Sequence, residues 1–163
     1  MKEKMKELLP QPEDEERLKN FKTKITKIIL KHWPNKEIKV YFYGSAVNGL
    51  WNHGSDVDVS ILVDQPEKYK LNRMWNIAKV LRKEKMKNVI AIQNARMPIC
   101  KFNEPETGID CDLSINNRMP IHNSRLIYCY VHLDPRVRDI IMIVKKWSKI
   151  KNINDSKSGT FCS

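Results

Sequence analysis

Residues 12–33 carry hydrophobic side chains at intervals of three and four, the spacing of one face of an α-helix. The apolar positions on this face are Leu18, Phe21, Ile25, Ile28, Ile29 and Trp33. Pro12 and the four acids that follow it suit a first helical turn, because acids there face the positive end of the helix dipole. Pro34 then ends the helix, so the pattern predicts one amphipathic helix over this segment.

Short runs rich in β-branched and aromatic residues predict strands over residues 38–43, 57–63, 89–92, 97–102 and 109–115. Residues 103–108 are typical of a turn, which favours an antiparallel hairpin between the last two strands. A short helical turn is expected at 46–51 and a longer helix at 66–87. The apolar face of the longer helix consists of Leu71, Met74, Ala78 and Leu81.

Two more helices are predicted over residues 120–132 and 134–151. In the second helix we expect five apolar side chains to point inward, namely Val137, Ile140, Ile141, Val144 and Trp147. Helices and strands therefore alternate before a helix-rich end, which predicts a mixed α/β (α+β) domain.

The chain has 163 residues, and no apolar run approaches the roughly 18–20 residues of a membrane span. The first residues lack the apolar core of a secretory signal. We therefore expect an intracellular protein without a membrane partner, placed in the cytoplasm with the nucleus and mitochondrion left open. The cysteines, Cys100, Cys111, Cys129 and Cys162, form no C-x-x-C pair, so we expect reduced thiols, most of which fill the core.

The net charge of +11 is unevenly distributed along the chain. Residues 65–101 hold ten basic and two acidic side chains, whereas residues 37–64 hold one basic and four acidic ones. Residues 102–133 are again acidic, with four acids and two bases. Acidic segments flanked by basic ones are compatible with a cation site inside a surface for polyanions. A solvated, lysine-rich face explains the charge equally well.

Asp56 and Asp58 are two residues apart at the start of a predicted strand, so both side chains point to one face. Two carboxylates on one face repel each other unless a cation lies between them. Oxygen ligands at this spacing suit Mg²⁺ or Mn²⁺, which share substrate phosphates and waters with the protein. The alternative is a solvated strand end.

Gly44 and Ser45 directly follow a predicted strand, where small residues let backbone N–H groups approach a triphosphate. A two-metal site needs a third carboxylate, and the strand 109–115 offers Asp110 and Asp112 on the same face. We favour Asp112 because it lies deeper in the apolar strand, where an unpaired charge would be costly. Asp110 is then an acid at the start of the strand.

Gly44-Ser45, Asp56-Val-Asp58 and Asp112 together resemble the signature of the DNA polymerase β-like nucleotidyltransferases. Later segments resemble the terminal uridylyltransferases and their template-independent poly(A) polymerase relatives. These segments are residues 111–118, 122–124, 134–138, 144–147 and 153–163.

The resemblance implies a nucleotidyltransferase palm with a mixed sheet, flanked by helices of a helical central domain. In that division, residues 1–11 are a flexible N-terminus and residues 12–34 form a helix that packs with the central-domain part. Residues 37–118 form the palm, and residues 119–163 start a central domain that we expect to be truncated.

The resemblance also implies roles for individual residues. Asp56, Asp58 and Asp112 would be catalytic and would hold two Mg²⁺ or Mn²⁺ ions. The nucleotide would be bound by Gly44, Ser45, Asn117, Asn123, Lys145, Lys149 and Ser163. Lys145 and Lys149 lie one helical turn apart, so both ammonium groups can reach one phosphate cluster.

The expected function is template-independent addition of UMP, or AMP, from an NTP to an RNA 3′ end. One alternative is a catalytically incomplete fragment that acts as an RNA-binding or regulatory module. Another is a member of the same superfamily that modifies a small molecule or a protein. The sequence leaves open the choice between UTP and ATP, the target RNA, partner proteins and the oligomeric state.

Overall fold

A five-stranded mixed sheet forms the centre of the chain, in a computed structural model that describes residues 10–52, 54–154 and 159. Its strand order is β1-β2-β5-β4-β3. The strands are β1 (Lys39–Tyr43), β2 (Val57–Leu62), β3 (Lys87–Ile92), β4 (Ile99–Glu104) and β5 (Ile109–Ile115). The β2–β5 pair is parallel and the other pairs are antiparallel, so the expected mixed α/β class is confirmed.

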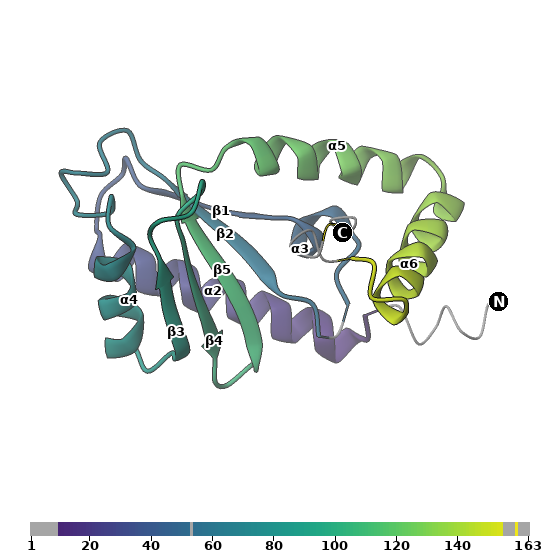
Figure 1. The fold of residues 1–163 in the computed structure, drawn as a ribbon, viewed down its shortest axis with the longest axis horizontal. Helices are drawn as coiled ribbons and strands as arrows, with labels where there is room; N and C mark the ends of the chain where they lie inside the picture. The colour runs from purple at the N-terminus through teal and green to yellow at the C-terminus, as the bar shows by residue number, and fades with distance from the viewer. Residues whose placement is uncertain (1–9, 53, 155–158, 160–163) are drawn as a thin grey trace.

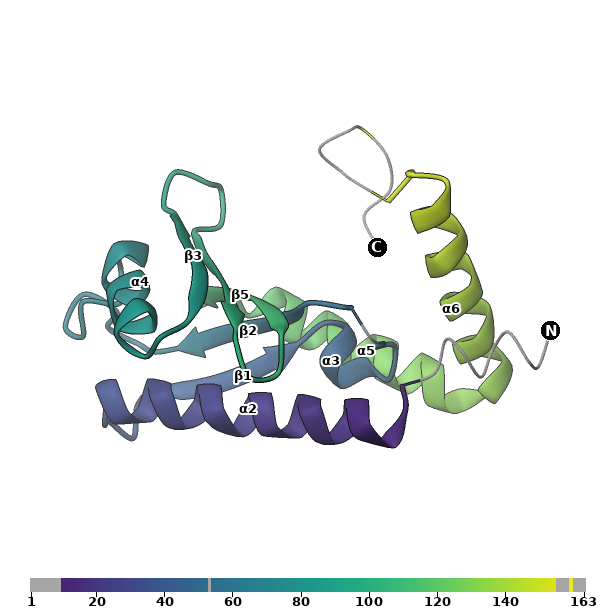
Figure 2. The ribbon, with the colours of Figure 1, turned by 90° about the horizontal axis from the view of Figure 1, so that it is seen from below.

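Helix α2 (Pro12–His32) lies along one face of the sheet (Figures 1 and 2). Its capping box joins Gln11 to Asp14, and acids fill its first turn, as the sequence predicts. Phe21, Ile25 and Ile29 are fully or almost fully buried beneath the sheet. The predicted amphipathic helix is therefore confirmed, and its apolar stripe forms core.

Helix α4 (Met74–Lys83) is shorter than the helix predicted over residues 66–87. Before it, the chain turns back, and the Leu71 amide donates to the Pro66 carbonyl at 2.8 Å. The helix ends at Lys83, and Lys85, with a φ of +63°, turns the chain out of the helical path two residues before β3 begins. The predicted span was too long because its apolar spacing continues through a turn that buries Leu71.

Strand β4 ends two residues later than predicted, at Glu104, and pairs with β5 as the expected antiparallel hairpin. Glu104 is fully buried and accepts hydrogen bonds from the amides of Glu106 and Thr107. The carboxylate also pairs with Lys24 of α2 at 2.8 Å. These contacts extend β4 through residues 103 and 104, which the residue types alone predict to be part of a turn.

The core lies between one face of the sheet and the helices α2 and α4. Val57 and Val59 of β2 and Cys111 and Leu113 of β5 are buried on this face. Because side chains alternate along a strand, the residues between them point to the opposite face. The carboxylates predicted to carry the chemistry are on that opposite face.

Helices α3 (Ser45–Asn48), α5 (Met119–Leu133) and α6 (Pro135–Ile150) follow the predicted order, and α6 stands apart from the sheet in both ribbon views (Figures 1 and 2). The inward face expected for α6 is wrong in part. Ile140, Val144 and Trp147 are 61%, 52% and 52% exposed, whereas Met142 is buried against α5. The apolar stripe of α6 is wider than the surface that α5 covers.

Cys100 and Cys111 are buried free thiols of the core, as expected. Cys129 of α5 is exposed, so it is an exception to the core role expected for most of the thiols. Cys162 lies outside the described residues. Among the described helices, none is both long and apolar enough to cross a lipid bilayer.

Candidate active site

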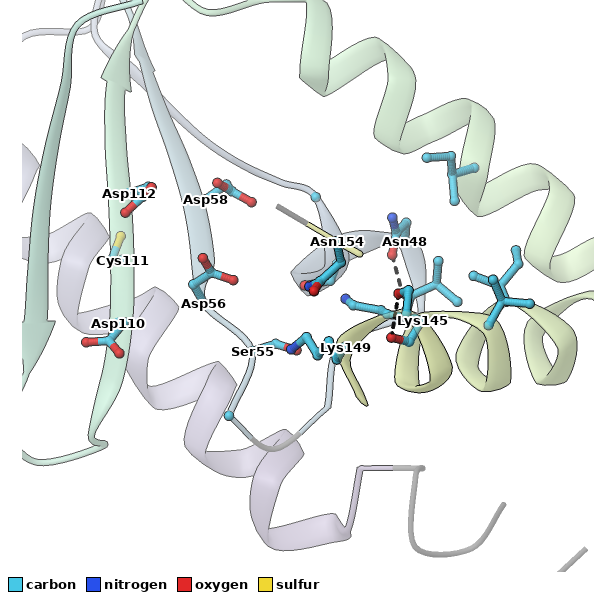
Figure 3. Close-up of a pocket in the computed structure, with 18 of the residues that line it drawn as sticks. Asn48, Ser55, Asp56, Asp58, Asp110, Cys111, Asp112, Lys145, Lys149 and Asn154 are labelled. Carbon is cyan, nitrogen blue, oxygen red and sulfur yellow. Dashed lines mark hydrogen bonds between the residues drawn. The ribbon is translucent and has the colours of Figure 1, made fainter. Parts of the chain in front are cut away.

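Asp58 on β2 and Asp112 on β5 are direct partners in the parallel register of the two central strands. Asp56 immediately precedes β2 and has the same parity as Asp58. All three carboxylates therefore project from the face of the sheet opposite the core (Figure 3). The structure thus brings together the three aspartates that the sequence singles out, from segments more than fifty residues apart.

The Asp58 carboxylate is crowded by other negative charges. Partial burial, followed by the charges of Asp56 and Asp112, raises the pKa of Asp58 to about 6. The ammonium groups of Lys101 and Lys145 act in the opposite direction. The two neighbouring charges thus disfavour the ionised form of Asp58. A bound cation would relieve this repulsion.

Asp112 is also held by a basic side chain. Lys101 of β4 lies opposite Asp112 in the antiparallel register and forms an ion pair with its Oδ2 atom. The neighbouring Asp110 is exposed and accepts a hydrogen bond from Asn103 Nδ2 at 2.9 Å. The two carboxylates of β5 that share a face therefore have different partners, and Asp112 is the one beside Asp58.

Gly44 brings the backbone against this cluster. It has φ +69° and ψ −151°, a region that is essentially restricted to glycine. A Cβ atom at this position would lie 2.5 Å from Oδ2 of Asp58. Ser45 begins α3 directly after it, and the Gly44 amide donates to Ser124 Oγ of α5 at 2.7 Å. The absence of a side chain at Gly44 is thus what permits the close approach.

A pocket of about 1270 Å³ lies in front of the aspartates and is lined by β-strand residues on one side and α6 on the other. This volume suffices for a nucleotide and part of a second ligand. Lys145 and Lys149 of α6 line it and extend toward the aspartate side (Figure 3). Burial lowers the pKa of the Lys145 ammonium, as does Lys149, whereas Asp56 and Asp58 raise it.

The remaining predicted nucleotide contacts are not gathered in this pocket. Asn117 follows β5, where its amide donates to Ser60 Oγ at 3.0 Å and its side chain faces the Tyr43 hydroxyl. Asn123 is exposed on α5, and neither asparagine lines the pocket. Ser163 lies outside the described residues. The assignment of these three residues to the nucleotide stays a prediction.

The pocket is also lined by polar residues to which the sequence analysis gives no role, namely Asn48, Ser55, Asn88, Lys101, Ser148 and Asn154. Asn48 and Ser55 are buried, and Asn48 Oδ1 accepts a hydrogen bond from the Leu50 amide. A buried asparagine in a short turn gives no sequence signal of its own. The position of Lys101 opposite Asp112 could have been predicted from the β4–β5 register, if the turn between these strands had been placed correctly.

The donor atoms of the site fit a magnesium-type ion in chemical character. Among the described residues, no group of three or more His, Cys, Asp and Glu side chains is arranged to hold a metal ion. Mg²⁺ does not require such a group, because it usually takes one or two carboxylates and completes its shell with waters and substrate phosphates. Asp56 and Asp58, with Asp112 one strand away, supply hard oxygen donors of this kind.

The chain is similar to known RNA-modifying polymerases. A family model described as "Poly(A) RNA polymerase, mitochondrial-like, central palm domain" matches residues 1–132. The poly(A) RNA polymerase cid11 of Schizosaccharomyces pombe is 34% identical over 157 residues, and cid13 of the same organism is 33% identical over 144 residues. These matches cover 96% and 88% of this chain, respectively.

Solved structures agree in fold. A mutant of the Cid1 poly(U) polymerase bound to MgATP has a TM-score of 0.84 at 26% identity and covers 97% of this chain. The palm fold expected from the sequence is therefore confirmed. The chain spans 49% of that solved chain, 32% of cid11 and 25% of cid13. The similarity thus concerns one part of larger proteins.

Proposed function

The chain belongs to the palm-domain family of the mitochondrial-like poly(A) RNA polymerases, and on that premise we propose that it transfers a nucleotide from an NTP to the 3′ end of RNA without a template. The relatives are named as poly(A) RNA polymerases, and the solved structures include a poly(U) polymerase. UMP and AMP are accordingly the two nucleotides that we propose are added to the RNA.

One arrangement carries this proposal. Asp58 and Asp112 are register partners on adjacent strands, the Gly44 backbone closes against Asp58, and two lysines of α6 face them across the pocket. Carboxylates on one side and ammonium groups on the other suit two substrates, one with a metal-binding triphosphate and one with a nucleophilic hydroxyl.

The proposed reaction is a nucleotidyl transfer. The RNA 3′-hydroxyl oxygen attacks the α-phosphorus of the NTP, and pyrophosphate leaves. Asp112 is proposed to accept the hydroxyl proton. Asp56, Asp58 and Asp112 would hold Mg²⁺ or Mn²⁺, which when bound would lower the pKa of the attacking hydroxyl and offset charge on the leaving oxygens.

The triphosphate is proposed to lie between Gly44-Ser45 and α6, with Lys145 and Lys149 contacting its outer phosphates. The half-buried Lys145 is the stronger candidate, because charge-assisted hydrogen bonds gain strength where water is excluded. Lys149 is exposed and contributes mainly by its charge.

The RNA acceptor is proposed to lie over the β3–β4 end of the pocket, which Asn88, Ile90 and Lys101 line. Contacts with phosphates give binding that depends on salt and is largely independent of sequence.

Primer extension tests the proposal. The chain is incubated with a short RNA, Mg²⁺ or Mn²⁺ and each NTP in turn, beside the Asp56→Ala/Asp58→Ala variant. Extension with UTP or ATP that the variant lacks supports the transferase and identifies its nucleotide. Equal extension by the variant would contradict it, because the product would then arise from a contaminant or another site.

A second candidate function, an RNA-binding module without transfer, is supported by the net charge of +11. It predicts RNA binding that weakens steeply with salt and no extension with any NTP. The same primer, used in a binding titration beside the extension assay, separates the two candidates.

A further inference from the structure

Lys101 is the basic side chain closest to the carboxylate cluster, and its place is fixed by the sheet. It lies opposite Asp112 in the β4–β5 register, and its ammonium group pairs with Oδ2 of Asp112. The Lys101 side chain is 42% exposed and the Asp112 side chain 22% exposed. The pair therefore lies at the pocket surface, where the lysine stem has room to move.

We propose that Lys101 is the resident counter-cation of the aspartate cluster, and that a divalent metal ion binds there only when the Lys101 ammonium moves from Asp112 to Asp110. This inference rests on the proposed function, since it concerns the same carboxylates. It assigns positioning roles to two residues that line the pocket, Lys101 and Asp110, without placing either among the metal ligands.

Charge makes the two occupants mutually exclusive. A divalent ion bound by Asp58 and Asp112 would lie beside an ammonium group hydrogen-bonded to the same Asp112 carboxylate. Like charges at such separations repel strongly in a partly desolvated pocket. Lys101 stabilises the metal-free cluster, because each of three adjacent carboxylates without a cation disfavours ionisation of the others.

Asp110 provides the second position. It lies two residues before Asp112 on the same face of β5, so it is the diagonal cross-strand neighbour of Lys101. Long side chains reach diagonal neighbours in antiparallel pairs. Lysine has a flexible four-carbon stem and no geometric requirement for its partner. Asp110 is exposed and already accepts from Asn103, yet a carboxylate can accept several donors.

Lys101 thereby lowers the affinity of the empty site for metal. A cation that arrives together with an NTP brings additional phosphate ligands, which help it to displace the ammonium group. Once displaced, the Lys101 ammonium stays on the β5 side of β4, where Asp110 lies.

Isothermal titration with Mn²⁺ in the absence of nucleotide and RNA tests the inference on the folded chain. Lys101→Gln is expected to lower the Mn²⁺ dissociation constant about fivefold, the size of a partly exposed ion pair. Lys101→Arg is expected to raise it, because the guanidinium fork holds a carboxylate more firmly. Because the two variants are expected to shift the dissociation constant in opposite directions, the test stays valid even if one of them folds poorly.

A double-mutant cycle tests the role of Asp110. Asp110→Asn removes the second position, so Mn²⁺ binding should weaken in the parent chain. In the Lys101→Gln background the same change should have little effect, because no ammonium group needs to move. Equal effects of Asp110→Asn in both backgrounds would overturn the role of Asp110.

Two controls complete the design. Lys87→Gln removes the same charge from an exposed position on β3 and should change the Mn²⁺ dissociation constant less than twofold. An equal gain in Lys87→Gln and Lys101→Gln would overturn the inference, since net charge would explain both. Asp58→Asn should abolish the titration. If the parent chain shows no such Asp58-dependent binding, the inference fails, whereas a lack of RNA extension alone would leave it standing.

Discussion

The Cα atom of Gly44 faces the carboxylate of Asp58 so closely that a Cβ atom would lie 2.5 Å from Oδ2. Glycine is thus required twice at this position, by the contact and by a φ of +69° combined with a ψ of −151°. The loop that follows β1 and the carboxylate on β2 form one unit, although they are separated by thirteen residues in the sequence.

Gly44→Ala should therefore destabilise the chain and impair transfer together. The backbone cost alone is about 1–3 kcal/mol, and relief of the clash would displace Asp58. Urea unfolding measures the first effect and primer extension the second. Gly108→Ala is the matched control, since Gly108 also has a positive φ, +68°, but nothing lies within 4 Å of its Cβ position. A Gly44→Ala variant with unimpaired transfer would contradict the proposed site.

Asp58→Asn should separate stability from activity. Burial and the charges of Asp56 and Asp112 raise the pKa of Asp58 to about 6, so the ionised form is disfavoured in the metal-free fold. Replacing it with a neutral isostere should raise the free energy of unfolding at neutral pH by about 1 kcal/mol. Transfer should fall by at least about 10³-fold, because metal-supported charge stabilisation is worth several kcal/mol.

Unfolding in urea without metal, beside extension rates with Mg²⁺, measures both quantities for Asp58→Asn. A variant that is less stable and still active would show that Asp58 serves the fold rather than the reaction.

The central part of the site follows from the sequence because strand alternation is a short-range property. Parity assigns Asp56 and Asp58 to one face of their strand and Asp110 and Asp112 to one face of theirs, and the sheet places Asp58 beside Asp112. Which strands are neighbours is not a local property, so the pairing of β2 with β5 could not be derived from spacing.

The Lys101–Asp112 pair shows how a small boundary error matters. A turn over residues 103–108 would pair residue 102 with residue 109 and set Lys101 opposite Asp110. In the structure β4 continues to Glu104, which pairs with Ile109, so Lys101 is opposite Asp112. The extension depends on burial of Glu104 against α2, a tertiary contact that residue propensities do not encode.

The stability of the fold should depend on pH through Glu104. Burial acts to raise the pKa of its carboxyl, but hydrogen bonds from Lys24, Thr107 and the amide of Glu106 outweigh it and lower the pKa to about 2. A depressed pKa stabilises the fold fully above the unfolded value near 4.5. That contribution, at most about 3 kcal/mol, is lost as the pH falls from about 4.5 through about 2.

Glu104→Gln should remove about 2 kcal/mol at neutral pH, since a charge-assisted network loses its anion. It should also flatten the dependence of the unfolding free energy on pH below about 4.5. Urea titrations at several pH values measure both. Glu106→Gln is the control, because Glu106 also pairs with Lys24 but its side chain is 77% exposed. If both variants behaved alike, burial of Glu104 would not be the source of the effect.

The lysines of α6 offer the sharpest test of where the triphosphate binds. Lys145 and Lys149 line the pocket, whereas Lys146, between them, is exposed and does not. Lys145→Ala should raise the KM for the NTP roughly 10-fold or more, since a charge-assisted contact with phosphate is worth about 1.5–3 kcal/mol. Lys149→Ala should have a smaller effect because its exposed charge is screened, and this effect should shrink as salt is added.

Lys146→Ala removes an equal charge from the same helix and should leave the KM within about twofold of the parent value, since an exposed charge outside the pocket is screened. Steady-state extension at several NTP and salt concentrations gives KM and kcat for each variant. A rise in KM without a matching fall in kcat would indicate binding made equally in the ground and transition states. If Lys146→Ala raised KM as much as Lys145→Ala, the effect would reflect the overall positive potential of α6, and the proposed triphosphate position would be wrong.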